Sequence, residues 1–198
     1  MVETDRIIDY FKSKFPFNQD GLEEFKNSFI TKTFKKGDII LTSRKKDHEL
    51  RFLDQGCVRE FYEKNGLQRN IDFHFNNSFI TDFFSFTNNQ YTKKNQECLT
   101  DTIIRILSKE TLDNFLVKYP CGKNFIEQLF NRAIISKEEN ELHLLMNTPE
   151  ENYERILTHN PIWIKTLPQH QIASYLGITP QHLSRLKKKS HSKPNENK

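Results

Sequence analysis

The sequence has no run of apolar residues close to the roughly 18 that a membrane-spanning helix needs. Its N-terminus is charged and amphipathic, and no basic region followed by an apolar run marks a secretory signal. Cysteine is also scarce. Cys57, Cys98 and Cys121 are odd in number and far apart, which fits a reduced compartment better than a disulfide framework. We therefore predict a cytoplasmic protein that does not associate with a membrane.

The motifs of common enzymes are missing as well. The sequence contains no Walker loop, no nucleophile elbow and no dinucleotide-binding fingerprint. Its scattered thiols are too few for an iron–sulfur cluster, and its histidines include no pair at metal-ligand spacing, so His74 and His143 are interpreted as structural or surface residues. Asp72 and His74 share a strand face, but such pairs are common without catalysis. We predict no enzyme activity, no metal and no cofactor.

Acidic residues almost disappear towards the end of the chain. From Asn160 onward the sequence holds seven Lys or Arg and a single acid, Glu196, so this part carries +6 and the remainder −2. A basic terminal unit is typical of proteins that bind a polyanion such as nucleic acid. A solvated basic tail would have the same charge, so the pattern of apolar residues must separate the two interpretations.

The first half of the chain combines short helices with a turn-rich segment. Apolar spacing predicts amphipathic helices over residues 4–15 and 20–29. Between residues 31 and 107 the apolar period shortens towards two, and turn signals recur roughly every ten residues. Residues 98–108 are interpreted as the last strand. This pattern favours an antiparallel β-barrel or sandwich, with a Phe-rich interior because the chain has 17 Phe and one Trp.

One hairpin is specified more strongly than the rest. Asn65-Gly66 stands between two alternating runs, and both central residues of a type I′ turn need positive φ. We expect Val58, Glu60 and Tyr62 to share one face of the first strand, with the intervening residues on the other.

Helical spacing returns after residue 108. Residues 109–120 predict a short helix that ends at Pro120, and residues 122–146 a long helix with no Pro or internal Gly. The long helix has an apolar stripe wide enough to cover its own domain and to pair with a second copy. Packing against its own barrel alone would also explain the stripe. The stripe residues are Phe125, Ile126, Leu129, Phe130, Ala133, Ile134, Leu142 and Leu145.

The next segment begins with a strong helix-start signal. Thr148 is an expected N-cap, Pro149 suits the first helical position, and Glu151 completes a capping box. Pro161 follows this helix, and we interpret the residues around Trp163 as a connection.

The segment "IASYLGITPQHLSRLKKK", residues 172–189, predicts a helix, a tight turn and a second helix. Gly177 stands where a helix end needs a left-handed residue, Thr179 is the expected N-cap of the second helix, and Pro180 its first residue. Apolar residues on both sides of the turn would form one small core: Ile172, Ala173, Leu176, Leu183 and Leu186.

The residues left outside that core suit DNA. A helix fits the major groove, where Arg donates two hydrogen bonds to guanine and Gln pairs with adenine, while Lys contacts phosphates. Use of the helix pair for protein contact alone remains the alternative. The candidate DNA-binding residues are Gln169, Thr179, Pro180, Gln181, His182, Ser184, Arg185, Lys187, Lys188 and Lys189.

With this motif after a turn-rich β segment and a long helix, the chain resembles the Crp/Fnr family of bacterial transcription regulators over nearly its whole length. The resemblance implies an α+β protein: a cyclic-nucleotide-binding-like double-stranded β-roll over residues 1–120, a dimerisation helix over 121–147, and a helix-turn-helix domain over 148–198. It implies a homodimer that binds a roughly palindromic operator, with Gln181 and Arg185 reading bases. RNA polymerase is a candidate partner. The residues after the second helix show no strand pattern that could form a wing.

The sequence departs from the family where a cyclic nucleotide would bind. Nucleotide-binding members have a Gly-Glu near the start of a phosphate cassette and an Arg about ten residues later. This chain has no Gly between Leu67 and Cys121, and an acid, Asp82, stands near the expected cassette start. We therefore predict no response to cAMP. The effector is unknown, and an apolar ligand among the phenylalanines is a second possibility beside an ordinary core. The candidate pocket region comprises Asp82, Phe83, Phe84, Thr92 and Lys93.

Overall fold

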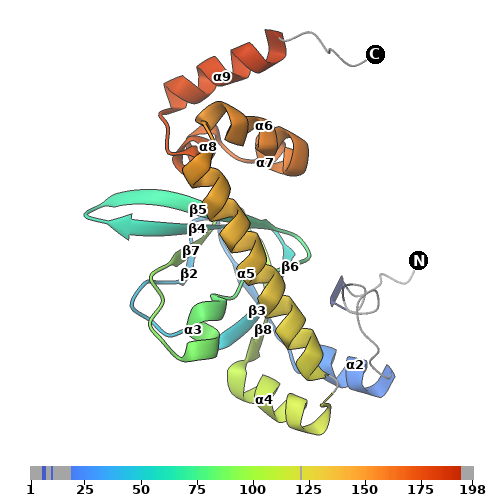
Figure 1. Cartoon of the computed structure of the whole chain (residues 1–198). Helices are drawn as coiled ribbons and strands as arrows, with labels where there is room; N and C mark the ends of the chain where they lie inside the picture. The colour runs from blue at the N-terminus through green and yellow to red at the C-terminus, as the bar shows by residue number, and fades with distance from the viewer. Residues whose placement is uncertain (1–5, 8–9, 11–18, 121, 193–198) are drawn as a thin grey trace, which may run out of the picture. The chain divides into compact units, whose positions relative to one another are not determined.

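The computed structural model describes residues 6–7, 10, 19–120 and 122–192 (Figure 1). The helix expected over residues 4–15 lies almost entirely outside the described residues, as does Cys121. The fold is α+β, as predicted, with two sheets followed by a series of helices. No helix in the described ranges is both long and apolar enough to cross a membrane.

The strands build two four-stranded sheets with the orders β1-β8-β3-β6 and β2-β7-β4-β5. Strands distant in sequence are therefore neighbours: β8 lies between β1 and β3 and is antiparallel to both. These crossing connections are those of a double-stranded roll. The strands are β1 (Ile30–Phe34), β2 (Ile39–Leu41), β3 (Glu49–Gln55), β4 (Cys57–Lys64), β5 (Leu67–Phe75), β6 (Ser78–Phe79), β7 (Asn95–Cys98) and β8 (Thr102–Ser108).

The predicted hairpin is confirmed. Asn65 and Gly66 both have positive φ, 53° and 78°, and they join β4 to β5. The base of β4 is buried at every position from Cys57 to Phe61, so side chains of both of its faces are covered there. The segment read as one last strand is divided, because Cys98 ends β7 and β8 begins at Thr102.

The helices agree with the predicted spans except around Trp163 and at α3, which lies inside the segment that was interpreted as strands and turns. The expected connection at that position is the short helix α7, in which Trp163 is buried. The helices are α2 (Gln19–Asn27), α3 (Phe83–Asn88), α4 (Lys109–Lys118), α5 (Gly122–Met146), α6 (Pro149–His159), α7 (Pro161–Thr166), α8 (Gln169–Leu176) and α9 (Pro180–Ser192).

The chain forms two compact units, one of residues 1–61 and 73–133 and the other of residues 62–72 and 134–198. The long helix α5 contributes to both, and the tip of the β4–β5 hairpin belongs to the second unit. The domain boundaries at residues 120 and 147 stay a prediction.

The first unit has two apolar layers. Between the sheets lie buried residues of both, including Leu53 and Ile104 from one and Val58 and Cys98 from the other. A second cluster joins the sheet of β3 to helices α2, α4 and α5. Strand β3 is buried at every position from Leu50 to Leu53 because its two faces serve different layers: Leu50 and Phe52 belong to the second cluster and Leu53 to the first. The second cluster includes Leu22, Phe25, Leu50, Phe52, Phe79, Phe86, Leu107, Leu112, Phe115, Ile126 and Leu129.

Candidate nucleic-acid interface

Helix α8, a tight turn and helix α9 form the predicted helix-turn-helix. Gly177 has φ of 69°, a left-handed conformation that L-residues adopt at a cost, and it ends α8. The backbone N–H of Ile178 donates to the carbonyl of Ala173 at 3.0 Å, and that of Gly177 donates to Ser174 at 3.3 Å. This pair of hydrogen bonds is the Schellman arrangement that closes a helix sharply.

The start of α9 is also capped as predicted. The Thr179 hydroxyl accepts a hydrogen bond from the backbone N–H of His182 at 3.2 Å, and Pro180 occupies the first helical position. The chain direction therefore changes within a few residues, and the second helix begins at a fixed angle to the first.

The predicted small core exists. One side of α9 presents Leu183 and Leu186, which are 0% and 3% exposed. On α8 the buried residues Ile172, Ala173 and Leu176 form the matching apolar side. A helix that buries one side in this way must show its other side to solvent.

The outer side of α9 carries the candidate base-reading residues. Gln181, Arg185 and Lys188 are exposed, and their spacing of four and three residues places them along one face of the helix. Helix α9 contains no acidic residue. Arginine, glutamine and lysine in this arrangement can donate to base edges and to phosphates.

The other predicted DNA-binding residues surround this face less evenly. Gln169, Thr179, Pro180 and Lys189 are exposed, whereas Ser184 and Lys187 are half-buried. His182 is half-buried too, and its Nε2 lies 3.9 Å from a carboxylate oxygen of Glu150 on α6. Its ring is thus turned partly towards α6.

Helices α6 and α7 support the motif from behind. The Thr148 hydroxyl accepts from the backbone N–H of Glu151, and the Glu151 carboxylate accepts from Thr148, so the predicted capping box is confirmed. Trp163 packs edge-to-face on Tyr175 of α8, with ring centroids 5.0 Å apart. The sequence did not predict this aromatic contact, because the Trp163 segment was not interpreted as a helix.

The last turns of α5 belong to the same compact unit as the motif. The Arg155 guanidinium donates to the side-chain oxygen of Asn140 at 2.6 Å, and the Asn152 amide donates to the carbonyl of His143 at 3.0 Å. Helix α6 is therefore attached to α5 by directional hydrogen bonds.

The apolar stripe predicted on α5 has two parts. Ile126 and Leu129 are buried in the first unit, and Phe130 packs on Phe83 with ring centroids 4.8 Å apart. Ala133 is half-buried, and the side chain of Phe125 lies outside the described part of the structure. These residues support the interpretation of a helix packed on its own barrel.

Five apolar residues in the second half of α5 are uncovered, and Leu144 beside them is half-buried. Their exposed fractions are 52% for Ile134, 55% for Ile135, 59% for Leu142, 82% for Leu145 and 75% for Met146. Ile135, Leu142 and Leu145 are separated by seven and three residues, the heptad spacing of a coiled-coil seam. Ile135 was missed by the sequence interpretation, which followed a stripe of helical period 3.6.

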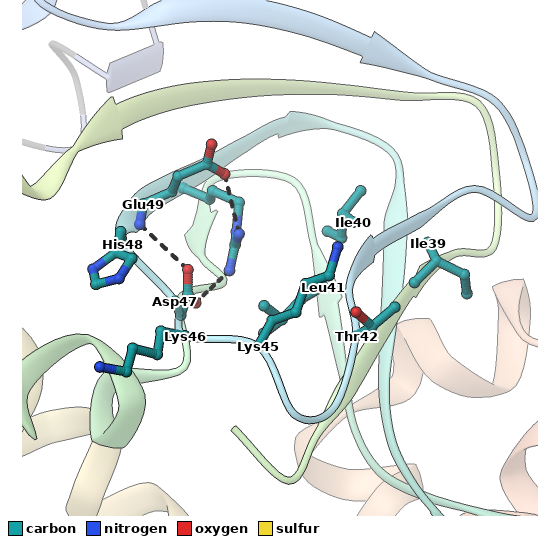
Figure 2. A pocket seen from close by; sticks show the side chains of 10 residues that line it. Ile39, Ile40, Leu41, Thr42, Lys45, Lys46, Asp47, His48 and Glu49 are labelled. Carbon is teal, nitrogen blue, oxygen red and sulfur yellow. Dashed lines mark hydrogen bonds and ion pairs between the residues drawn. The ribbon is translucent and has the colours of Figure 1, made fainter. Parts of the chain in front are cut away.

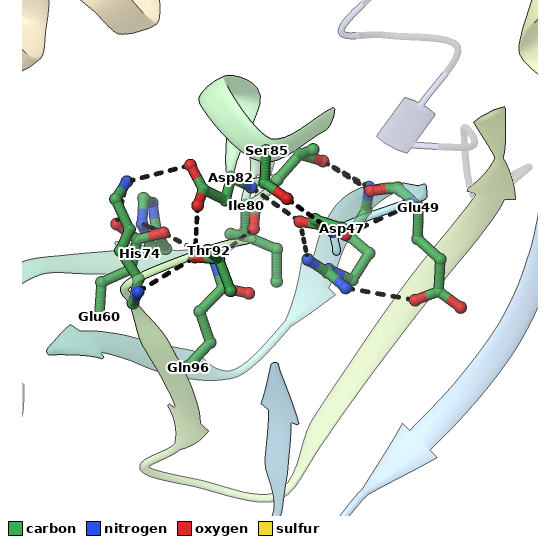
Figure 3. Close-up of polar contacts among 12 residues, drawn as sticks. Asp47, Glu49, Glu60, His74, Ile80, Asp82, Ser85, Thr92 and Gln96 are labelled. Carbon is green, nitrogen blue, oxygen red and sulfur yellow. Dashed lines mark hydrogen bonds and ion pairs between the residues drawn. The ribbon is translucent and has the colours of Figure 1, made fainter. Parts of the chain in front are cut away.

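A polar cluster fills part of the interior of the roll. Asp82 and Thr92 are 3% and 2% exposed, and the Thr92 hydroxyl donates to the Asp82 carboxylate. The Lys94 ammonium lies 3.1 Å from one Glu60 oxygen and 3.8 Å from Asp82. Figure 3 shows Thr92 joined to Asp82, with Glu60 near them.

Glu60 is satisfied from several directions. The Gln96 amide donates to it at 2.6 Å, and His74 Nε2 lies 3.8 Å from the same oxygen. Burial raises the pKa of Glu60, but the charges of Lys94 and His74 and the hydrogen bonds from Gln96 and Lys94 outweigh burial and hold the pKa below its usual value. Glu60 is therefore an ionised part of the interior.

The chain is similar to solved structures of transcription regulators. No family model matches the sequence, and no curated protein matches it. Among solved structures, FixK2 from Bradyrhizobium japonicum is similar with a TM-score of 0.72 and 16% identity, over 83% of this chain and 85% of that one. A protein assigned to the crp/fnr family of transcriptional regulators from Eubacterium rectale is similar with a TM-score of 0.66 and 15% identity, over 92% and 88% of the two chains. The chain has the Crp/Fnr fold.

Other Crp/Fnr structures match over similar lengths. The c-di-GMP-responsive global regulator CLP of Xanthomonas campestris has a TM-score of 0.69 and 11% identity, over 88% of this chain and 92% of that one. The predicted roll, long helix and helix-turn-helix are therefore confirmed as the elements of one known fold.

The region in which the sequence departs from the nucleotide-binding cassette lies around α3. Asp82 directly precedes α3, and Thr92 is the residue ten positions later. The two side chains bind each other. Lys93 is exposed, and Lys94, not Lys93, places its ammonium in the interior. Phe84 is 60% exposed, while Phe83 packs on Phe130. The candidate pocket region thus contains a polar cluster.

A surface pocket of about 250 Å³ opens in the roll beside β2 and the segment before β3 (Figure 2). Lys45 and Lys46 line it together with Asp47, Glu49 and Arg51. The Arg51 guanidinium is buried and already paired with the carboxylates of Asp47 and Glu49. The buried cation of this pocket is therefore neutralised within the protein.

Proposed function

We propose that the chain is a cytoplasmic, homodimeric, sequence-specific DNA-binding transcription regulator that does not respond to cAMP and has no catalytic activity. The observation that carries the proposal is the outer face of α9. The helix-turn-helix core buries Leu183 and Leu186, and it leaves Gln181, Arg185 and Lys188 exposed on the opposite side.

The electrostatics of α9 support DNA as the partner. The helix carries Arg185 and three consecutive lysines without an acid. Lysine and arginine that neutralise phosphates release counterions, so binding should weaken steeply as salt rises. An Arg that donates to two acceptors of guanine adds sequence discrimination to this general attraction.

The uncovered half of the α5 stripe supports a homodimer. Five large apolar side chains on one helix are more than half exposed in the single chain: Ile134, Ile135, Leu142, Leu145 and Met146. Large apolar side chains exposed on one helix are typical of an interface, and three of these five have coiled-coil spacing, with the polar residues 136–141 between the first two and the last three. Two copies related by a two-fold axis would present two α9 helices to successive major grooves about 34 Å apart, on a roughly palindromic operator.

The roll interior supports the lack of a cAMP response. A cyclic nucleotide needs a cation for its phosphate and space for its ribose, as the cassette of the nucleotide-binding members provides. Here Thr92 binds Asp82, and Lys94 is held between Asp82 and Glu60. A phosphate placed beside Asp82 would meet a carboxylate and would compete with Glu60 for Lys94. The structural neighbours do not indicate a common effector either, because one is a catabolite activator protein and another is responsive to c-di-GMP.

The test is a selection of random duplex DNA on the purified protein, followed by affinity measurements across a salt series. We expect a palindromic consensus bound without added nucleotide. Arg185→Ala should weaken binding by about 1–3 kcal/mol and relax discrimination at one base pair, whereas Lys188→Ala should weaken binding to all sequences and reduce the salt slope by about 1. Lys165→Ala is the matched control, because it removes the same charge from an exposed position on α7.

The result that would overturn the proposal is weak binding that is indifferent to sequence. The second candidate function, a module whose helix-turn-helix contacts another protein such as RNA polymerase, would then replace it. Millimolar cAMP should leave both the thermal midpoint and the DNA affinity unchanged. A nucleotide-dependent rise in either would contradict the proposed insensitivity alone.

A further inference from the structure

The β4–β5 hairpin binds the first helix of the helix-turn-helix through one buried side chain. Asn70, on β5, is 1% exposed. Its amide nitrogen donates to the main-chain carbonyl of Gln171 at 3.0 Å and to the Gln171 side-chain oxygen at 2.6 Å. Its backbone N–H donates to the Ser174 hydroxyl at 3.1 Å. Three hydrogen bonds therefore join one residue of the hairpin to one side of α8.

Neighbouring residues of β5 extend this contact along α8. A Cβ at Gly177 would lie 2.5 Å from a terminal nitrogen of Arg69, so the guanidinium lies directly over the turn of the motif. Burial raises the pKa of the Tyr175 hydroxyl, and the Asp72 carboxylate raises it further. Hairpin residues 69, 70 and 72 thus lie beside the last turns of α8 and the turn that follows it.

The rest of the same compact unit holds the motif at another place. Helix α6 is attached to α5 by the hydrogen bonds from Arg155 to Asn140 and from Asn152 to His143. These contacts lie at α6, whereas the Asn70 contacts lie at α8. If the motif were attached at α6 alone, α8 and α9 could still rotate about that attachment. The second attachment, at α8, prevents this rotation.

We propose that Asn70 is a positioning residue for DNA recognition, and that its hydrogen bonds to Gln171 and Ser174 fix the orientation in which the helix-turn-helix meets DNA. This inference rests on the proposed function. In a two-fold dimer the orientation of each motif sets the distance between the two α9 helices, and therefore the half-site spacing that the dimer accepts. A motif released from the hairpin would accept a wider range of spacings.

The experiment measures spacing preference with the full-length protein. The consensus operator is made with its half-sites at the selected spacing and at one base pair more or fewer, and the ratio of affinities is compared between variants. Asn70→Ala removes both side-chain donors and leaves the Gln171 carbonyl buried without them. We expect this ratio to fall about tenfold, since lost hydrogen bonds of this kind are each worth up to about 1.5 kcal/mol.

Two further variants keep the test decisive. Gln68→Ala changes an exposed residue of the same strand whose side chain donates to Glu63, and it should retain the wild-type ratio. Asn70→Ser places a small polar group in the same site and replaces Asn70→Ala if that variant does not fold. A loss of folded protein alone lowers the apparent affinity for every spacing equally, so it leaves the ratio unchanged.

The outcomes separate the inference from the function on which it rests. Wild-type spacing ratios in both Asn70 variants would overturn the positioning role while leaving the DNA-binding regulator intact. Failure of the wild-type protein to select any operator would overturn the proposed function. The contact itself is then judged by hydrogen exchange: α8 amides that exchange as slowly in Asn70→Ala as in wild type would show that Asn70 does not hold α8.

Discussion

Leu145→Ala tests the dimer interface on α5 with a magnitude that follows from the structure. The side chain is 82% exposed in the single chain, and the substitution removes three carbon atoms. At about 0.8 kcal/mol for each buried methylene or methyl group, the loss is about 2 kcal/mol per copy. Because a two-fold interface contains Leu145 twice, the dimer should lose about 4 kcal/mol, or about a thousandfold in Kd.

Sedimentation equilibrium over a wide concentration range provides the assay. Val117→Ala is the matched control, because Val117 is 80% exposed on α4 and lies off the α5 stripe. We expect its Kd to equal that of the wild type, and both variants to keep the wild-type thermal midpoint at concentrations where each is monomeric. A Leu145→Ala dimer as tight as the control would refute the assignment of this residue to the interface. A wild-type chain that stays monomeric at all concentrations would refute the dimer.

Three further predictions concern the stability of the fold. Burial and the neighbouring Cys98 raise the pKa of the Cys57 thiol to about 12. In a Cys121→Ser background, neither buried thiol should therefore react with iodoacetamide near neutral pH until the protein is unfolded. Mass spectrometry measures the adducts, and adducts on the native protein would contradict this prediction. The lowered pKa of Glu60 means that its ionisation stabilises the fold above its usual value of 4.5 and that this stabilisation is lost as the pH falls below it. Wild-type unfolding free energy should therefore fall more steeply with acid than that of Glu60→Gln, and parallel curves would argue against an ionised Glu60. Gly177→Ala should lower the urea-unfolding free energy by about 1–2 kcal/mol because φ is 69°, and an unchanged value would show that the turn relaxes.

Local signals in the sequence predicted those parts of the molecule that depend on near neighbours in the chain. The Thr148 capping box, the Asn65-Gly66 turn and the Gly177 helix end each need only a few consecutive residues, and all three are confirmed. The core of the helix-turn-helix was predictable for the same reason, since its apolar residues lie within one short segment. The candidate DNA-binding residues on α9 could be predicted from that core, because a helix that buries one face exposes the residues of its opposite face.

The roll interior was predictable only in part. From the absence of glycine and the position of Asp82 we predicted that no phosphate is held there, and this stays a prediction. The sequence did not reveal that Thr92 would bind Asp82, or that Lys94 and not Lys93 would reach Glu60. These pairings depend on how β4, β7 and the start of α3 pack together. Lys94 and Glu60 are 34 positions apart, and nothing in a single sequence indicates that two such distant residues are in contact.

Helix α8 also has a long-range contact that the sequence did not predict. Periodicity assigned Ile172, Ala173 and Leu176 to a core and made no prediction for the polar residues Gln171 and Ser174. Gln171 is nevertheless only 9% exposed, because Asn70 of a hairpin about 100 residues earlier covers it. A buried amide of this kind is stable only when its hydrogen bonds are made, so the polar side of α8 constrains the motif as its apolar side does. Polar residues on an amphipathic helix therefore do not by themselves indicate a free surface. Gln181 and Arg185 on α9 are exposed, whereas Gln171 on α8 is covered by a strand that supplies its hydrogen-bond partner.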